Sequence, residues 1–343
     1  MAKAAALFSC EYGKIRPVNV IEAEAILARA MERPRAMSQA ELAGLLGCDD
    51  AAVWDAVFAA AREMKRRLGK DEVLPRGLIE CSNICAKDCL YCGIRKSNAK
   101  VRRYRLSEAE ALACVAEARQ RGYPAVAFQA GEIEGEANTA YYERLLAGCR
   151  GLEVTLSLGE QTEDVYRRWK DAGAMRYLLR IETSNRELYA KIHPQECSFD
   201  RRVACLRTLN RLGYVTGTGV MIGLPGQTLD DLARDIVFFG EIDADMVGMG
   251  PYIPHPETPL GEGVSGPGGL EMALRMIALV RLYMWNVNIV AATALEALDP
   301  ARGRARGLAA GANVVMPNVT VPSCRRAYDL YPGKSEAACE MPS

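Results

Sequence analysis

Four of the 12 cysteines in this 343-residue chain lie between residues 81 and 92. Within this group, Cys85, Cys89 and Cys92 form a CxxxCxxC pattern. Thiolates are the natural ligands of iron–sulfur clusters, and one compact loop can bring three of them to a cuboidal cluster. Three protein ligands would leave one iron of a [4Fe–4S] cluster open, which permits chemistry as well as electron storage. Cys81 is expected to pack inside a strand.

A structural zinc site is the alternative interpretation of these thiols. Such a site usually has a closed set of four ligands, commonly arranged as two CxxC-like pairs. The sequence has no second pair, and its only histidines are His193 and His255. The remaining cysteines are scattered and are expected to be small buried hydrophobes; they are Cys10, Cys48, Cys114, Cys149, Cys197, Cys205, Cys324 and Cys339.

Bulk composition excludes several classes of partner. The chain has 43 basic and 43 acidic residues, so its net charge is zero, and no basic patch stands out. We therefore expect no nucleic-acid binding. The apolar run 272–295 contains Arg275 and Arg281, which argues against a membrane span. The apolar stretch near the N-terminus is too short for an export signal, so a cytoplasmic location is expected.

The order of predicted elements indicates an α/β fold. Residues 20–70 have helical patterns, including a Ser38–Glu41 capping box and a stripe of Trp54, Val57, Phe58 and Met64. From Gly77 onward, short apolar runs alternate with amphipathic helices, which predicts parallel βαβ units. Eight such strands predict a (β/α)8 TIM-type barrel with an N-terminal helical extension: residues 1–72 form the extension and 73–343 the barrel. The predicted strands are 77–82, 125–129, 153–158, 176–182, 216–222, 246–252, 288–293 and 313–317.

The barrel is expected to gather the unusual residues on one rim, because the chemistry of such barrels lies where strands end and βα loops begin. The cysteine segment follows the first predicted strand directly. Residues 129–132 end the second strand, 159–160 the third, and 180–183 the fourth.

A CxxxCxxC segment after the first strand of a barrel resembles the signature of the radical S-adenosylmethionine (SAM) superfamily. The resemblance implies that the methionyl amine and carboxylate of SAM chelate the open iron, and that reductive cleavage of SAM releases a 5′-deoxyadenosyl radical. It also implies a one-electron donor such as ferredoxin or flavodoxin. The protein would supply positioning and electrostatics.

SAM needs partners for its charged ends. Ala130-Gly131-Glu132 resembles the GGE motif that holds the methionyl amine. Arg180 and Arg202 are candidates for a two-pronged contact with the carboxylate. Glu182 should share the barrel face of Arg180, because side chains alternate along a strand. The alternative for each of these charges is an ordinary buried ion pair.

Longer segments resemble the HydE family of [FeFe]-hydrogenase maturases, among them 92–98, 155–160, 250–260 and 311–318. This resemblance implies SAM contacts from Thr155, Arg180, Glu182 and Arg202. It also implies a substrate cavity whose lining is Arg76, Gln129, Thr293, Met316, Tyr328 and Tyr331. Core packing, or a barrel-floor ion pair for Arg76, is the alternative. The implied substrate is an iron–cysteine complex with carbonyl and cyanide ligands, supplied by HydG, whose product would pass to HydF.

The sequence departs from the HydE pattern at Ile181, Ala130 and Ala292, where His, Ser and Thr are usual. Rival interpretations are therefore a HydE-like paralogue acting on another small molecule, as methylornithine synthase does, and a biotin-synthase-like enzyme. The latter is disfavoured because the other cysteines fall mainly in helices or termini. A non-enzymatic iron–sulfur protein would not require Arg180, Glu182 and Arg202.

Overall fold

The computed structural model describes residues 15–261 and 268–334, so Cys10 and Cys339 lie outside the described residues. Eight parallel strands pair side by side, and a bridge between Val290 and Val314 joins the two ends of the sheet into a barrel. In spatial order they are β10 (Val314–Val315), β1 (Leu74–Ser82), β2 (Ala125–Ala130), β3 (Glu153–Ser157), β4 (Arg176–Leu178), β5 (Val215–Thr218), β7 (Met246–Val247) and β9 (Asn288–Ile289). The expected (β/α)8 barrel is confirmed.

Two of the predicted strands are interrupted at the same height. The run predicted as 216–222 divides into β5 and β6 (Met221–Ile222), and the run predicted as 246–252 divides into β7 and β8 (Gly250–Pro251). Between the two halves of each strand, the segments around Gly219 and Gly248 approach very closely. A Cβ on Gly219 would lie 1.7 Å from the Gly248 carbonyl oxygen. Only glycine permits such an approach, and it takes the place of regular pairing.

Other strands end earlier in the sequence than predicted. The strand predicted as 176–182 ends at Leu178, and further along the chain Glu182 has a left-handed backbone conformation, with φ of 67°. The strand predicted as 288–293 ends at Ile289, and Thr293 is instead the first residue of α11.

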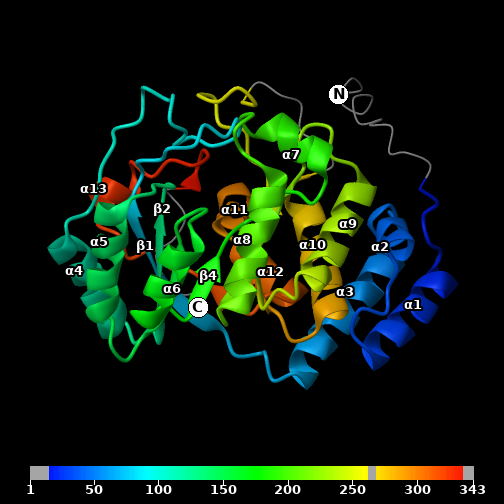
Figure 1. The fold of residues 1–343 in the computed structure, drawn as a ribbon. Coiled ribbons are helices and arrows are strands. Elements are labelled where there is room, and N and C mark those ends of the chain that lie inside the picture. Colours follow the sequence, from blue (N-terminus) through cyan, green and yellow to red (C-terminus); the bar gives the residue numbers. More distant parts are fainter. Residues whose placement is uncertain (1–14, 262–267, 335–343) are drawn as a thin grey trace.

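Helices surround the strands (Figure 1). Ser107 and Glu110 form a capping box at the start of α4, and the predicted capping box of Ser38 and Glu41 starts the N-terminal helix Gln39–Leu46. The barrel helices are α4 (Glu108–Gln120), α5 (Glu136–Ala147), α6 (Glu163–Asp171), α7 (Arg186–Ile192), α8 (Phe199–Arg211), α9 (Leu229–Glu241), α10 (Leu270–Met284), α11 (Thr293–Leu298), α12 (Gly303–Ala310) and α13 (Pro322–Arg325). Within the described ranges, none of the helices is both long and apolar enough to cross a lipid bilayer.

The N-terminal helices α1 (Val20–Glu32), α2 (Gln39–Leu46) and α3 (Ala51–Arg67) pack beside the barrel against α9 and α10 (Figure 1). Trp54, Val57 and Met64 of α3 are buried, as the stripe predicted. The division of the chain at residue 72 stays a prediction.

Arg281 of α10 hydrogen-bonds the segments around the junction where the barrel closes. Its side chain is fully buried, and its guanidinium donates to the carbonyls of Gly311 at 3.0 Å and Val287 at 2.8 Å, and to that of Trp285. It also donates to the Asn313 side chain at 3.0 Å, which in turn accepts the Ile289 N–H at 2.9 Å. One cation thus ties α10 to the two strands that close the barrel.

We predict that Arg281→Met lowers the free energy of unfolding by about 3 kcal/mol, because several buried acceptors lose their donor at once. Chemical denaturation of the variant and the parent measures the difference. Arg211→Met is the control: Arg211 is exposed and paired with Glu163, and a surface pair of this kind contributes at most about 1 kcal/mol. Equal stability of the two variants would contradict the role assigned to Arg281.

Candidate functional site

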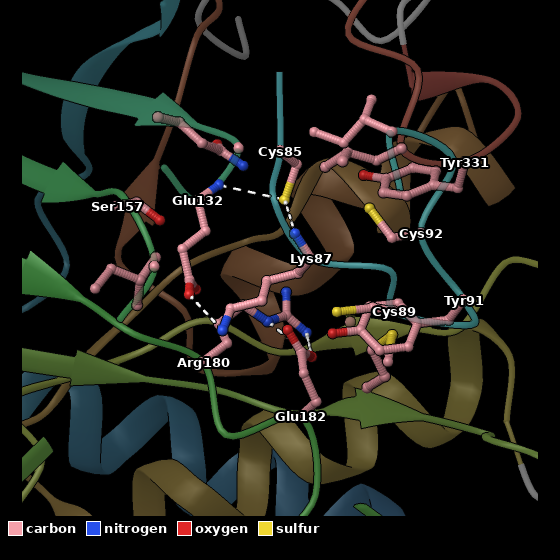
Figure 2. A pocket seen from close by; sticks show the side chains of 18 of the residues that line it. Cys85, Lys87, Cys89, Tyr91, Cys92, Glu132, Ser157, Arg180, Glu182 and Tyr331 are labelled. Atoms are coloured by element: carbon pink, nitrogen blue, oxygen red, sulfur yellow. Dashed lines mark hydrogen bonds and ion pairs between the residues drawn. The ribbon is translucent and has the colours of Figure 1, made fainter. Parts of the chain in front are cut away.

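A cavity of about 270 Å³ opens at the carboxyl end of the barrel. It lies among the loop after β1, the ends of β2 to β4, and the segment after α13 (Figure 2). Most of the residues singled out from the sequence line it: Cys85, Cys89, Cys92, Gln129, Glu132, Arg180, Glu182, Arg202, Tyr328 and Tyr331. The expectation that one rim gathers these residues is therefore met for this group.

The three thiols of the loop face the cavity, whereas Cys81 is buried in β1, as expected. Backbone N–H groups point at the sulfurs: those of Lys87 at 3.4 Å and Glu132 at 3.3 Å donate to Cys85, and that of Ile94 donates to Cys92. Such hydrogen bonds are the usual environment of iron–sulfur ligands.

The chemistry of this donor set fits an iron–sulfur cluster. Burial raises the pKa of Cys92 to about 12 and also raises the pKa of Cys85, so these thiols ionise only against a bound positive centre. In the part of the chain that the structure describes, no three or more Cys, His, Asp or Glu side chains converge on a position for a single metal ion. Three soft thiolate ligands on one loop fit an iron–sulfur cluster.

Glu132 lies beside the cysteine loop and has two partners. Its Oε2 accepts the Glu160 N–H at 2.9 Å, and its Oε1 lies 3.1 Å from the Lys87 ammonium (Figure 2). Gly131 explains why the loops can meet here, since a Cβ at that position would lie 2.3 Å from the Ile84 carbonyl oxygen. Lys87 was not predicted as a site residue; its position inside the CxxxCxxC segment was the available signal.

Arg180 and Glu182 form an ion pair of 3.0 Å at the cavity wall (Figure 2). Both line the cavity, as predicted, but the reason given was wrong. Strand alternation does not apply, because β4 ends at Leu178 and Glu182 has a positive φ. The Arg180 guanidinium also donates to the Val220 carbonyl at 2.8 Å, and a third of its side chain is exposed.

Arg202 is more firmly committed to the protein than Arg180. Its Nε lies 2.6 Å from Glu160, and its Nη1 donates to the Arg180 carbonyl at 2.6 Å. Arg201 also pairs with Glu160, at 3.1 Å. Each arginine has two nitrogens bonded within the protein, but the side chain of Arg180 is 33% exposed and that of Arg202 only 8%, which makes Arg180 the more available partner for a ligand carboxylate. Glu160 was not predicted as a site residue, although it stands at the end of the third strand.

Three predicted residues lie elsewhere. Arg76, Thr155 and Met316 line a separate small cavity of about 20 Å³, which shares Leu178 with the large one. The Arg76 guanidinium is 3.4 Å from the Thr155 hydroxyl and contacts Met246 sulfur at 3.2 Å. Among the described residues no carboxylate lies within ion-pair distance of Arg76, and Glu153 acts on it only from further away, so a direct ion pair is not found. Burial lowers its pKa to about 10.

Thr293 lines neither cavity, but its hydroxyl hydrogen-bonds the phenol of Tyr331, which lines the large one. A cysteine expected to be a plain buried hydrophobe also has a polar neighbour: the thiol of Cys197 hydrogen-bonds that of Cys89. The sequence offered no signal for this contact, because residues 89 and 197 are joined only by the fold.

Tyr91, between two of the cavity cysteines, is held by a buried histidine. The Nδ1 of His193 lies 3.0 Å from the Tyr189 carbonyl oxygen, which can only accept, so Nδ1 carries the proton. Nε2 therefore accepts the Tyr91 hydroxyl at 3.1 Å. Burial, helped by the nearby charge of Arg202, lowers the pKa of His193 to about 3.

We predict that this histidine makes the fold sensitive to acid. Unfolded histidine takes up a proton near pH 6.5 and the folded His193 only near pH 3, so the unfolded state binds more protons in between. The free energy of unfolding must therefore decrease as the pH is lowered below 6.5, by up to about 1.4 kcal/mol per pH unit. His193→Gln should remove that part of the slope between pH 6.5 and 5 in denaturation experiments; an unchanged slope would contradict the assignment.

Comparison with known proteins agrees with this geometry. Residues 79–239 match the family model of the radical SAM superfamily. The [FeFe] hydrogenase maturase subunit HydE of Thermotoga maritima is 44% identical over 295 residues, which cover 84% of this chain and 82% of that protein. The 3-methylornithine synthase of Methanosarcina acetivorans is 25% identical over 81% of this chain and 79% of its own length.

The solved structure of methylornithine synthase (PylB) has the same fold, with a TM-score of 0.77 at 23% identity over 85% of both chains. The similarity to HydE is far higher in sequence and extends over most of both proteins. The chain is therefore an enzyme of the radical SAM superfamily, which uses a [4Fe–4S] cluster and SAM, and it belongs to the HydE family.

Proposed function

We propose that this enzyme cleaves SAM reductively in the large cavity and acts in the maturation of the [FeFe]-hydrogenase active-site cluster. One observation carries the proposal: three thiols, the Arg180–Glu182 ion pair, Arg202 and Glu132 line a single cavity at the carboxyl end of the barrel. The 44% identity to the HydE subunit supports the more specific part.

In this proposal Cys85, Cys89 and Cys92 hold the cluster, which together with SAM supplies a 5′-deoxyadenosyl radical. The Glu132 carboxylate accepts hydrogen bonds from the methionyl amine. It lies beside the cysteine loop and already pairs with an ammonium group, that of Lys87. Arg180 takes the methionyl carboxylate and Glu182 a hydroxyl of the ribose. Arg202 positions this group through its contact with the Arg180 carbonyl. Thr155 is not part of this set, since it lines the small cavity.

The substrate is proposed to occupy the cavity beside Gln129, Tyr328 and Tyr331. Arg76 contributes a buried cation in the adjoining small cavity, which favours a substrate with negative charge or strong hydrogen-bond acceptors. An iron–cysteine complex with carbonyl and cyanide ligands has these properties. HydG as its source, HydF as the acceptor of the product and a ferredoxin or flavodoxin as the electron donor complete the proposal. A cytoplasmic location stays a prediction.

The three departures from the HydE pattern differ in how far they change the cavity in which the substrate is proposed to bind. Ile181 is fully buried in the hydrophobic core and does not line the cavity, so it leaves the binding surface unchanged. Ala130 and Ala292 do line the cavity, where each replaces a hydroxyl. Two lost hydroxyls favour the second candidate, a paralogue acting on another small molecule. The similarity to 3-methylornithine synthase also supports that alternative.

We predict that Cys89→Ala abolishes both loading of the cluster and formation of 5′-deoxyadenosine. Iron and sulfide content after anaerobic reconstitution, and 5′-deoxyadenosine formed in the presence of dithionite and SAM, are the two measurements. Cys205→Ala is the matched control, since Cys205 is a buried thiol on α8 that does not line the cavity. Full cluster content and SAM cleavage in Cys89→Ala would refute the ligand assignment.

Arg76→Ala separates the substrate site from the SAM site. We predict that SAM cleavage without substrate stays close to that of the parent, whereas turnover of the complex generated by HydG falls more than about tenfold. Chromatography of 5′-deoxyadenosine, with and without the HydG product, measures both. Arg176→Ala, at a neighbouring arginine that pairs with Glu153, is the control. Equal loss of both activities would count against a substrate role for Arg76.

A further inference from the structure

A buried carboxyl group on α9 lies behind the cavity wall. Asp235 is fully buried, and its Oδ1 accepts two hydrogen bonds of 2.6 Å, from the backbone N–H and from the hydroxyl of Ser184. Its Oδ2 is buried without a hydrogen-bond partner. A carboxyl group in this setting costs stability through its lost hydration, and none of the roles assigned so far uses it.

Ser184 lies two residues after Glu182, whose backbone is strained. Glu182 is one of four non-glycine residues with positive φ in the described part of the chain. The left-handed conformation costs a non-glycine residue about 1–2 kcal/mol, so contacts on both sides must hold it. On one side the Glu182 N–H donates to the Gly219 carbonyl, and its own carbonyl accepts the Met221 N–H, both at 3.0 Å.

The other side of Glu182 is held by α9. Besides the two bonds from Ser184 to Asp235, the side chain of Asn185 donates to Asp231 at 2.7 Å. Asn185 also caps α7 through the N–H groups of Glu187 and Leu188. The turn after β4 is therefore fixed between the interrupted strands β5–β6 and two carboxyl groups on α9.

The direction of the Glu182 side chain depends on this turn. With φ at 67°, its carboxylate points to the Arg180 guanidinium and lines the cavity (Figure 2). With an extended backbone at residue 182, the Cα–Cβ bond of Glu182 would point in another direction. Its carboxylate would then no longer meet the Arg180 guanidinium at the cavity wall. Precise placement of charged groups is what binding of a charged ligand requires.

We propose that Asp235 is a positioning residue of the SAM site: through Ser184 it keeps Glu182 in the left-handed conformation that aims its carboxylate into the cavity. This inference rests on the proposed contact between Glu182 and SAM. Asp235 itself touches neither SAM nor the cluster, and it acts only through the turn.

The test compares SAM binding by reconstituted holoenzyme variants, with thermal unfolding measured on the same samples. Asp235→Ala should raise the dissociation constant for SAM about tenfold, the size expected when a supporting hydrogen-bond partner is removed. The KM for SAM in 5′-deoxyadenosine formation should rise by the same factor, with kcat changed much less. Asp235→Asn keeps one acceptor oxygen for Ser184 and should restore most of the affinity.

Two comparisons make the result specific. Glu182→Ala should weaken SAM binding at least as much, and the Asp235→Ala/Glu182→Ala double variant should bind no worse than Glu182→Ala alone, because both act through one carboxylate. Asp245→Ala is the control: Asp245 accepts the Thr216 N–H at 2.8 Å near the start of β5, away from the cavity. It should leave SAM affinity unchanged, whatever it does to thermal unfolding.

The outcomes separate this inference from the function it rests on. If Glu182→Ala weakens binding and Asp235→Ala does not, the positioning role is wrong while the SAM site stands. If Glu182→Ala has no effect, the SAM contact itself is wrong and the inference falls with it. Should Asp235→Ala fail to fold, Ser184→Ala removes one of the two bonds to Asp235 and should raise the dissociation constant about threefold; an unchanged value would overturn the proposal.

Discussion

Two of the three cavity thiols, Cys85 and Cys92, are constrained by burial more than by any single bond. A buried thiolate is costly, and burial raises the pKa of Cys85 and Cys92 above its ordinary value. The backbone N–H groups that point at the sulfurs offset only part of this cost. The loop can therefore become anionic only when a positive centre binds, so cluster assembly and ionisation of the thiols must occur together. The proposed chemistry of the cavity depends on that coupling.

The charged residues around the thiols form two groups with different freedom. Glu160 and Arg202 are almost completely buried and bonded to each other and to the backbone, so they form a fixed frame. Arg180 is a third exposed, and its ion pair with Glu182 leaves it able to exchange partners. A ligand with one amine and one carboxylate would then take Glu132 from Lys87 and Arg180 from Glu182, and the displaced Lys87 and Glu182 would turn to water or to other ligand groups. The fixed frame would keep that exchange local.

Part of this arrangement could be predicted from the sequence, because local patterns determine it. The spacing of Cys85, Cys89 and Cys92 predicted a loop with three thiols, and alternating apolar runs predicted the barrel. The capping box Ser38–Glu41 placed a helix start correctly. Charged residues at strand ends, such as Glu132 and Arg180, were found because the barrel brings all carboxyl ends of its strands to one rim.

The rest depends on contacts between distant segments. No local pattern indicates that Gly219 meets Gly248, so the breaks in two strands could not be foreseen. The left-handed turn at Glu182 is imposed by β5–β6 and α9, against the preference of a glutamate. Thr155 was assigned by resemblance alone and lies in the small cavity, since its depth in the barrel is set by the register of β3.

The most direct test of the central claim is electron paramagnetic resonance of the anaerobically reconstituted, dithionite-reduced protein, recorded with and without SAM. In the proposed site three protein thiolates would leave one iron of the cluster open, so the spectrum of a reduced [4Fe–4S] cluster should appear and should change its g-values when SAM binds. A signal that is the same with and without SAM, or a protein that takes up zinc in place of iron, would contradict the account.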